Sequence, residues 1–123
     1  MTAARTNPAP VCYITKDGSA IRELLNAAVS PGLGLSLAEA TVEAGGATEP
    51  HYHSAFDEIY YCLEGEGTLH VDGETYPFVP GGFFLLPGNA VHHLRAATRL
   101  RLLCICCPGY DHEHTFLTEP QAR

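Results

Sequence analysis

Apolar and polar residues alternate along most of this chain, which is the pattern of strands with one buried face. The stretches that show it lie at residues 11–14, 33–43, 58–63, 68–71, 83–86 and 100–107. Glycine, proline and aspartate separate them, and Asp72-Gly73 is a typical two-residue hairpin turn between two alternating stretches. The pattern therefore predicts an all-β protein.

One stretch departs from this alternation. Apolar residues recur at helical spacing between residues 21 and 28, and Ser19 stands where a helix N-cap is expected. Ser30-Pro31-Gly32 would end such a helix. We predict one short helix near the N-terminus and no other.

Many short strands with regular turns favour an antiparallel β-barrel or a jelly roll, because two packed sheets protect each other's edges. A chain of 123 residues is long enough for one core and too short for two. Pro8 and Pro10 among small polar residues indicate a flexible arm at 1–10. We expect a single domain over 11–110 and a polar tail over 111–123.

Composition narrows the possible partners. With 46% hydrophobic and 17% charged residues, the chain has the balance of an ordinary globular protein. A formal charge of -7 and only 7 lysines and arginines argue against nucleic acid or an anionic membrane as partner. No apolar run has the length of a membrane helix, and residues 1–8 lack an apolar signal core, so we expect a cytoplasmic protein.

Cysteine usage agrees with a reducing compartment. The five cysteines are odd in number, form no Cys-x-x-Cys pair and have mostly apolar neighbours. We expect them to be thiols of the core.

Candidate chemistry concentrates between residues 45 and 65. His51 and His53 share one face of a strand, and residues 54–57 are enough for a reversal that would bring Glu58 beside them. Glu58 opens an apolar stretch, where an unpaired charge would cost several kcal/mol. Imidazole and carboxylate together suit iron, manganese, nickel, cobalt or zinc better than calcium or magnesium. A solvated polar edge is the plain alternative.

The same residues resemble the first signature motif of the cupin superfamily, and a later stretch resembles the second. The first motif is filled by Gly45, His51, His53, Glu58 and Gly65. The second is matched by Gly81 and by residues 87–92, which end in His92. The resemblance implies a small conical β-barrel, with His92 as the fourth ligand of an internal divalent metal ion. The chain differs from the usual second motif and its surroundings at Gly82, Asn89 and Ala96.

Strand alternation extends the predicted site. Counting by twos from each ligand places further side chains on the inner face: Tyr60, Cys62, Leu94, Leu102 and Cys104. We expect these to line a largely apolar substrate pocket, with Tyr60 as a hydrogen-bond donor to substrate and Glu58 as a ligand that can also accept a proton. For the cysteines, ordinary core packing is the alternative.

The remaining histidines have more ordinary explanations. Alternation turns His70 and His93 away from the ligands. His112 and His114 have the spacing of a metal pair but follow the last long strand, without a third ligand nearby. This tail can still fold over the mouth of the barrel, which is a hypothesis for the structure to test.

Three imidazoles and one carboxylate leave about two positions of an octahedral ion for substrate, water or dioxygen. No lysine or arginine occurs between Arg22 and Arg95, so a phosphorylated substrate fits poorly and a neutral, oxygen-bearing molecule fits better. By resemblance to cupins we favour a dioxygenase of the quercetinase type. The alternatives are a redox-neutral cyclase, dehydratase or isomerase, and a small-molecule-binding accessory module without turnover.

Outward-facing apolar residues add a prediction about assembly. Ile59 and Tyr61 on one strand, with Leu103 and Ile105 on another, need cover that a single small barrel does not give. We expect a homodimer.

Overall fold

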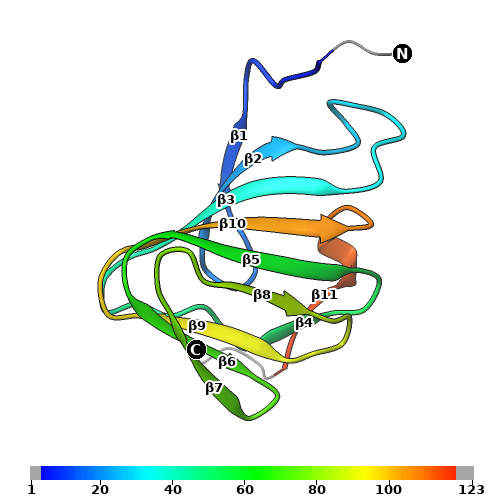
Figure 1. The fold of residues 1–123 in the computed structure, drawn as a ribbon. Helices are drawn as coiled ribbons and strands as arrows, with labels where there is room; N and C mark the ends of the chain where they lie inside the picture. The colour runs from blue at the N-terminus through cyan, green and yellow to red at the C-terminus, as the bar shows by residue number, and fades with distance from the viewer. Residues whose placement is uncertain (1–3, 119–123) are drawn as a thin grey trace.

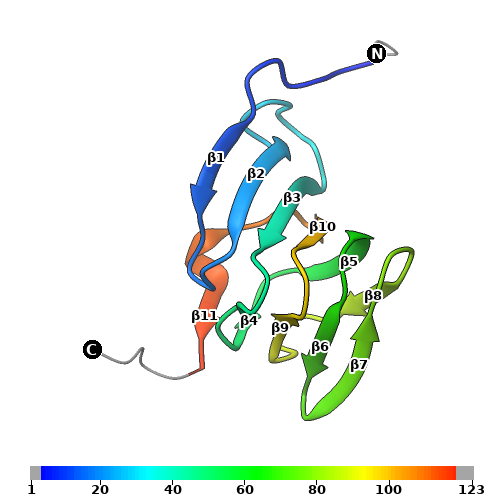
Figure 2. The same cartoon turned by 90° about the vertical axis from the view of Figure 1, so that its left-hand side faces the viewer.

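Two antiparallel sheets face each other in the computed structural model, which describes residues 4–118 (Figure 1). The six-stranded sheet has the order β1 (Val11–Ile14), β2 (Ala20–Leu25), β3 (Ser36–Val42), β10 (Leu100–Cys107), β5 (Asp57–Glu64), β8 (Phe83–Leu86). The five-stranded sheet has the order β11 (Thr115–Leu117), β4 (His51–His53), β9 (His92–Ala96), β6 (Gly67–Val71), β7 (Glu74–Phe78). Figure 2 shows β1, β2 and β3 in the upper part of the molecule and the five-stranded sheet across the lower part. The all-β fold predicted from the alternation is confirmed.

The core lies between the two sheets because each strand turns alternate side chains inward. Along β5 burial follows this period, with Glu58, Tyr60 and Cys62 buried and their neighbours exposed. Leu69 and Phe78 of the five-stranded sheet are fully buried in the same cluster. The inner face of the fold is therefore mainly apolar, and a charged side chain there needs a specific partner.

The predicted N-terminal helix is wrong. Residues 20–25 form strand β2, which pairs with β1 on one side and β3 on the other. Neighbouring strands on both sides satisfy the backbone of this segment, and such long-range pairing outweighs a helical pattern over two turns. Ser19 does not cap a helix; its hydroxyl donates to Asp17 Oδ1 at 2.6 Å within the β1–β2 hairpin turn.

Two turns near the centre of the fold agree with the sequence. Asp72-Gly73 joins β6 to β7, and both residues have positive φ, 47° and 86°. Asn89, where the usual motif has glycine, has φ 72° and donates its backbone N–H to His53 O at 2.7 Å. Asparagine tolerates the left-handed region better than most residues, so the substitution preserves the turn.

The two ends of the described chain differ. Residues 4–10 contain no strand, and Arg5 donates to Ser30 Oγ at 2.6 Å. A short 3-10 helix, η1 (His112–His114), leads into β11, which pairs with β4 beside the histidines. The predicted flexibility of 1–10 stays a prediction, and residues 1–3 and 119–123 lie outside the described part.

The cysteines do not all behave as core thiols. Cys62 and Cys106 are buried and Cys104 is partly buried, but Cys12 and Cys107 are exposed. Cys12 lies on β1 at the edge of its sheet, and Cys107 is the last residue of β10. Within residues 4–118, no helix has the length and apolar character needed to cross a membrane.

Candidate metal centre

Four polar side chains meet in the interior, where strands of both sheets face each other. His51 and His53 come from β4, His92 from the adjacent β9, and Glu58 from β5 of the opposite sheet. Each is at most 6% exposed, and one ligand atom from each lies within 4.8 Å of all the others. The strand pairing explains this, because His51 and His92 are direct cross-strand partners. The structure thus brings together the four residues that the motifs indicated.

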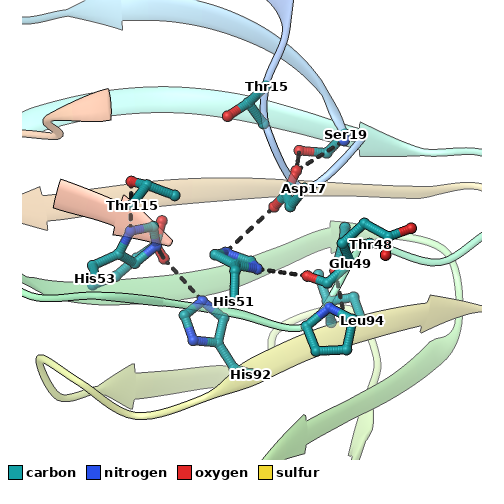
Figure 3. Close-up of polar contacts among 12 residues, drawn as sticks. Thr15, Asp17, Ser19, Thr48, Glu49, His51, His53, His92, Leu94 and Thr115 are labelled. Atoms are coloured by element: carbon teal, nitrogen blue, oxygen red, sulfur yellow. Dashed lines mark hydrogen bonds and ion pairs between the residues drawn. The ribbon is translucent and has the colours of Figure 1, made fainter. Parts of the chain in front are cut away.

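The three imidazoles are held with the same nitrogen facing inward. His51 Nδ1 lies 2.8 Å from Glu49 O (Figure 3). His92 Nδ1 lies 2.9 Å from Ala90 O, so each Nδ1 carries the proton and donates. His53 Nδ1 lies 2.9 Å from Thr115 Oγ1, which donates its own proton to Asp111 O at 3.2 Å. Thr115 must therefore accept from His53. The Nε2 lone pairs of all three rings remain for the centre.

Glu58 faces these lone pairs. Its Oε1 lies 3.1 Å from His53 Nε2 and 3.4 Å from His92 Nε2, and Cys106 Sγ donates to Oε2 at 3.6 Å. Burial raises the pKa of Glu58, but the neighbouring His53 and His92 outweigh burial and hold that pKa well below its usual range. Glu58 is therefore a carboxylate, and the thiol at Oε2 directs Oε1 to the histidines.

A bound cation would balance the carboxylate charge and the nitrogen lone pairs of this cluster. Burial, with His92 as a second cause, lowers the pKa of His51 to about 4, so this ring is neutral at neutral pH. His92 Nε2 is buried and has no hydrogen-bond partner in the described part of the chain. Without an ion, burial opposes a proton on His92, but the facing Glu58 carboxylate outweighs burial and raises the pKa of that ring. A divalent transition metal ion would instead accept the three nitrogen lone pairs and the carboxylate oxygen. The donor set does not distinguish iron from manganese, nickel, cobalt or zinc.

A second carboxylate lies near the inward-facing nitrogen of His51. Asp17 Oδ2 is 3.5 Å from His51 Nε2, while Oδ1 accepts from the backbone N–H and the hydroxyl of Ser19 (Figure 3). Asp17 is 7% exposed and belongs to the β1–β2 turn, far from the motifs in sequence. The turn therefore fixes a carboxylate beside the centre with one oxygen directed toward it.

A cavity opens from the centre along the inner face of the six-stranded sheet. Four of the five predicted pocket residues line it, and these are Tyr60, Leu94, Leu102 and Cys104. Cys62 does not line the cavity; it is fully buried in the core cluster beside Leu102, its partner on β10. Burial, followed by the charge of Glu58, raises the pKa of Tyr60 and of Cys104, so the phenol and the thiol keep their protons.

The wall of the cavity is mainly apolar, in line with the prediction, but it also includes polar side chains that the sequence did not place there. These are Tyr13, Thr15, Asp17, Ser19, Glu23, Thr48, Tyr110 and Thr115. Those on β1, β2 and their turn were hidden by the helix prediction, since strand alternation through residue 23 would have turned Glu23 inward. Tyr110 and Thr115 carry no sequence signal, because only the tertiary pairing of β11 with β4 brings the tail to the site.

The remaining histidines lie away from the centre, as expected. His70 and His93 stack on each other on the outer face, with ring centroids 4.3 Å apart and an interplanar angle of 1°. His112 and His114 lie in η1, where exposed His114 Nδ1 is 2.8 Å from Asp111 Oδ2. The tail nonetheless contributes to the cavity through Tyr110 and Thr115, which supports the hypothesis that it covers the mouth.

A small barrel of two antiparallel sheets with an internal three-histidine, one-carboxylate cluster defines a class of β-barrel proteins built to hold one metal ion inside. The chain belongs to the cupin family: the family model described as "Cupin domain" matches residues 38–106, which include all four cluster residues.

Known relatives agree with this assignment. An uncharacterised protein of Methanocaldococcus jannaschii is 41% identical over 109 residues, 87% of each chain. The L-ectoine synthase of Mycobacterium sp. (strain KMS) is 37% identical over 79 residues, so the match spans 63% of this chain and only 60% of that enzyme. The crystal structure of ectoine synthase from P. lautus superimposes with a TM-score of 0.69 at 30% identity, covering 93% of this chain and 83% of the other.

Proposed function

We propose that this protein is a metal-dependent enzyme that carries out a redox-neutral cyclisation, dehydration or isomerisation of a small molecule. The observation that carries the proposal is the three-histidine, one-carboxylate cluster at the inner end of a cavity, with the carboxylate of Asp17 fixed beside it. Similarity to L-ectoine synthases, which are not oxidoreductases, favours this reading over the dioxygenase expected from the sequence.

The proposed ligands are His51, His53, Glu58 and His92. A bound divalent ion would act as a Lewis acid on a carbonyl or hydroxyl oxygen of the substrate. The chain supplies the proton-transfer group, because Asp17 holds Oδ1 in hydrogen bonds from Ser19 and leaves Oδ2 to accept or return a proton. The protonated Tyr60 hydroxyl lines the cavity and can donate to the substrate.

Oxygen dependence separates the two enzyme readings. The purified protein is first analysed for its metal, then incubated with that metal and a small-molecule extract under argon and under air, and product masses are followed. We expect substrates that rearrange or lose one water equally well under both gases. Products that gain oxygen atoms, formed only under air, would overturn the proposal and restore the dioxygenase.

Two variants test the assigned roles. Asp17→Asn removes the proton acceptor but no proposed ligand, so the metal content should persist while turnover falls about 100-fold or more. Glu58→Gln should lose metal and turnover together. Metal-loaded wild-type protein that binds compounds from the extract and converts none would instead support the accessory-module reading.

We also propose that two copies pair through the outer face of β5 and β8. Ile59 and Leu85 are cross-strand partners there, as are Tyr61 and Phe83, and the four are 39%, 62%, 40% and 70% exposed. Two adjacent rows of exposed apolar side chains can pack against the same rows of a second copy. Light scattering after gel filtration should give a dimer, and Phe83→Lys should shift it toward monomer. Val11→Lys, at a 62% exposed position on the distant edge strand β1, is the matched control; a wild-type monomer would contradict the pairing.

A further inference from the structure

The cavity extends from the metal centre across four strands of the six-stranded sheet. One row of successive backbone partners runs from Tyr60 on β5 through Cys104 and Ala38 to Glu23 on β2. At about 4.8 Å per strand, the two ends of the row are roughly 14 Å apart. The two residues between them, Cys104 and Ala38, have small side chains and leave space above the sheet along this row.

Glu23 closes the end of the cavity opposite the metal centre. Its side chain lines the cavity, and the residue as a whole is only 7% exposed. Its Oε2 accepts a hydrogen bond from the Tyr13 hydroxyl at 2.8 Å. No lysine, arginine or histidine pairs with it in residues 4–118. Burial raises the pKa of Glu23 even though hydrogen bonds from Tyr13 and Asn26 oppose this. The carboxylate thus has neutral donors, and a bound cation is the partner that would stabilise its charge.

The charges around the cavity point to the same kind of ligand. Among the described residues that line it, the formal charges are the carboxylates of Asp17, Glu23 and Glu58, and no lysine or arginine is present. An anion or phosphate has no counter-charge in this space beyond the metal centre itself. A positively charged group would be attracted along its whole length.

A second polar group lines the cavity at its metal end. Tyr60 is only 3% exposed, and burial with the charge of Glu58 raises the pKa of its phenol, so the hydroxyl keeps its proton. Its ring packs edge-on against His92, with centroids 5.7 Å apart, which fixes the direction of the phenol. The Tyr60 hydroxyl can therefore donate to a polar group of the ligand at the metal end, while Glu23 offers a carboxylate without a basic partner at the other end.

We propose that Glu23 is the cation subsite of the substrate cavity, so that the substrate is an amine-bearing molecule that meets the metal centre through an oxygen and Glu23 through its protonated nitrogen. Only the metal end of this assignment rests on the function proposed above. Tyr13 holds the carboxylate in place, the ammonium group donates to this carboxylate, and the Tyr60 hydroxyl bonds the polar group next to the metal. The neutral substrate expected from the sequence is replaced by a cationic one.

Binding of simple probes tests this without knowledge of the substrate. Protein reconstituted with zinc is titrated calorimetrically with ε-aminocaproate, which has a carboxylate and an ammonium group, with caproate, which lacks the ammonium, and with pentylamine, which lacks the carboxylate. We expect ε-aminocaproate to bind about tenfold tighter than either partial probe, the gain typical of one charge-assisted hydrogen bond.

Variants assign the preference to one carboxylate. Glu23→Gln keeps the shape of the side chain and its hydrogen bond with Tyr13. It should lower the affinity for ε-aminocaproate to that for caproate. Glu23→Asp keeps the charge and should retain part of the preference. Glu39→Gln is the matched control, because Glu39 lies on the adjacent strand but faces outward, bonded to Arg101. Circular dichroism establishes that each variant is folded.

The outcomes separate the subsite from the metal centre. Equal affinities of ε-aminocaproate and caproate in the wild type, or a preference that survives Glu23→Gln, would overturn the cation subsite and leave the metal proposal intact. Pentylamine binding that depends on Glu23, with no binding of caproate, would support the subsite and refute the metal end. No binding of any probe would overturn both.

Discussion

At the scale of single residues, the centre depends on which nitrogen each histidine directs inward. Main-chain carbonyls fix two of the rings and Thr115 fixes the third, so the protein itself sets the tautomers before any ion binds. The sequence alone identified the three histidines through their spacing in the two motifs. It could not identify Thr115, whose contact with His53 joins positions 62 residues apart.

Removal of one ligand should abolish metal binding, and removal of its neighbour should not. His92→Ala takes away a buried Nε2 with no hydrogen-bond partner in residues 4–118, so we expect metal affinity to fall at least about 100-fold. His93→Ala is the control, since His93 stacks on His70 on the outer face. Metal content after loading and desalting, measured by mass spectrometry, compares the two. Equal metal content in both variants would show that His92 is not a ligand.

Thr115 should matter through His53. Thr115→Val keeps the shape of a side chain that is 2% exposed but removes the oxygen that accepts from Nδ1. The ring then loses its orientation, and we expect metal affinity to fall about tenfold in a chelator competition, with recovery in Thr115→Ser. Thr75→Val, which removes an exposed hydroxyl beside His70, is the control and should have no effect. Wild-type affinity in Thr115→Val would mean that packing alone orients His53.

At the scale of elements, strands whose alternation was strong were predictable and the one segment with mixed periodicity was not. β1, β8 and β10 have the bounds that the pattern indicated. Residues 20–25 satisfied a helical spacing locally, but two neighbouring strands gave them backbone partners that no local pattern reveals. This single error also concealed Asp17 and Glu23, because both depend on a hairpin at that place.

Gly65 tests how tightly the elements pack where β5 leads into β6. Its φ is +92°, and a Cβ there would collide with the carbonyl oxygen of Arg99, just before β10. Gly65→Ala should therefore destabilise the fold by about 3 kcal/mol, from backbone strain and a clash that rigid backbone cannot relieve. Gly73→Ala has a similar φ of +86° but open space, so about 1 kcal/mol is expected. Urea unfolding measures both, and equal losses would show that the close approach to Arg99 has no effect on stability.

At the scale of the whole molecule, the centre joins the two sheets. Three ligands stand on the five-stranded sheet and Glu58 on the six-stranded sheet, while the cavity runs between the sheets toward Glu23. The same inward alternation that builds the apolar core at one end therefore builds the site at the other. The family motifs sufficed to place the metal end, but the polar end required the tertiary arrangement of β1, β2 and the tail.

A metal ion held between two sheets should stabilise the whole fold. Because the folded state brings the four donors together and an unfolded chain does not, free metal at about 100 times its dissociation constant adds about 2.7 kcal/mol. For a domain of this size, that corresponds to a rise in Tm of roughly 10 °C. Scanning calorimetry of metal-loaded protein with and without EDTA measures the difference, and His92→Ala, which lacks one donor, should show none. The same Tm for wild-type protein in both conditions would mean that no ion links Glu58 to the histidines across the two sheets.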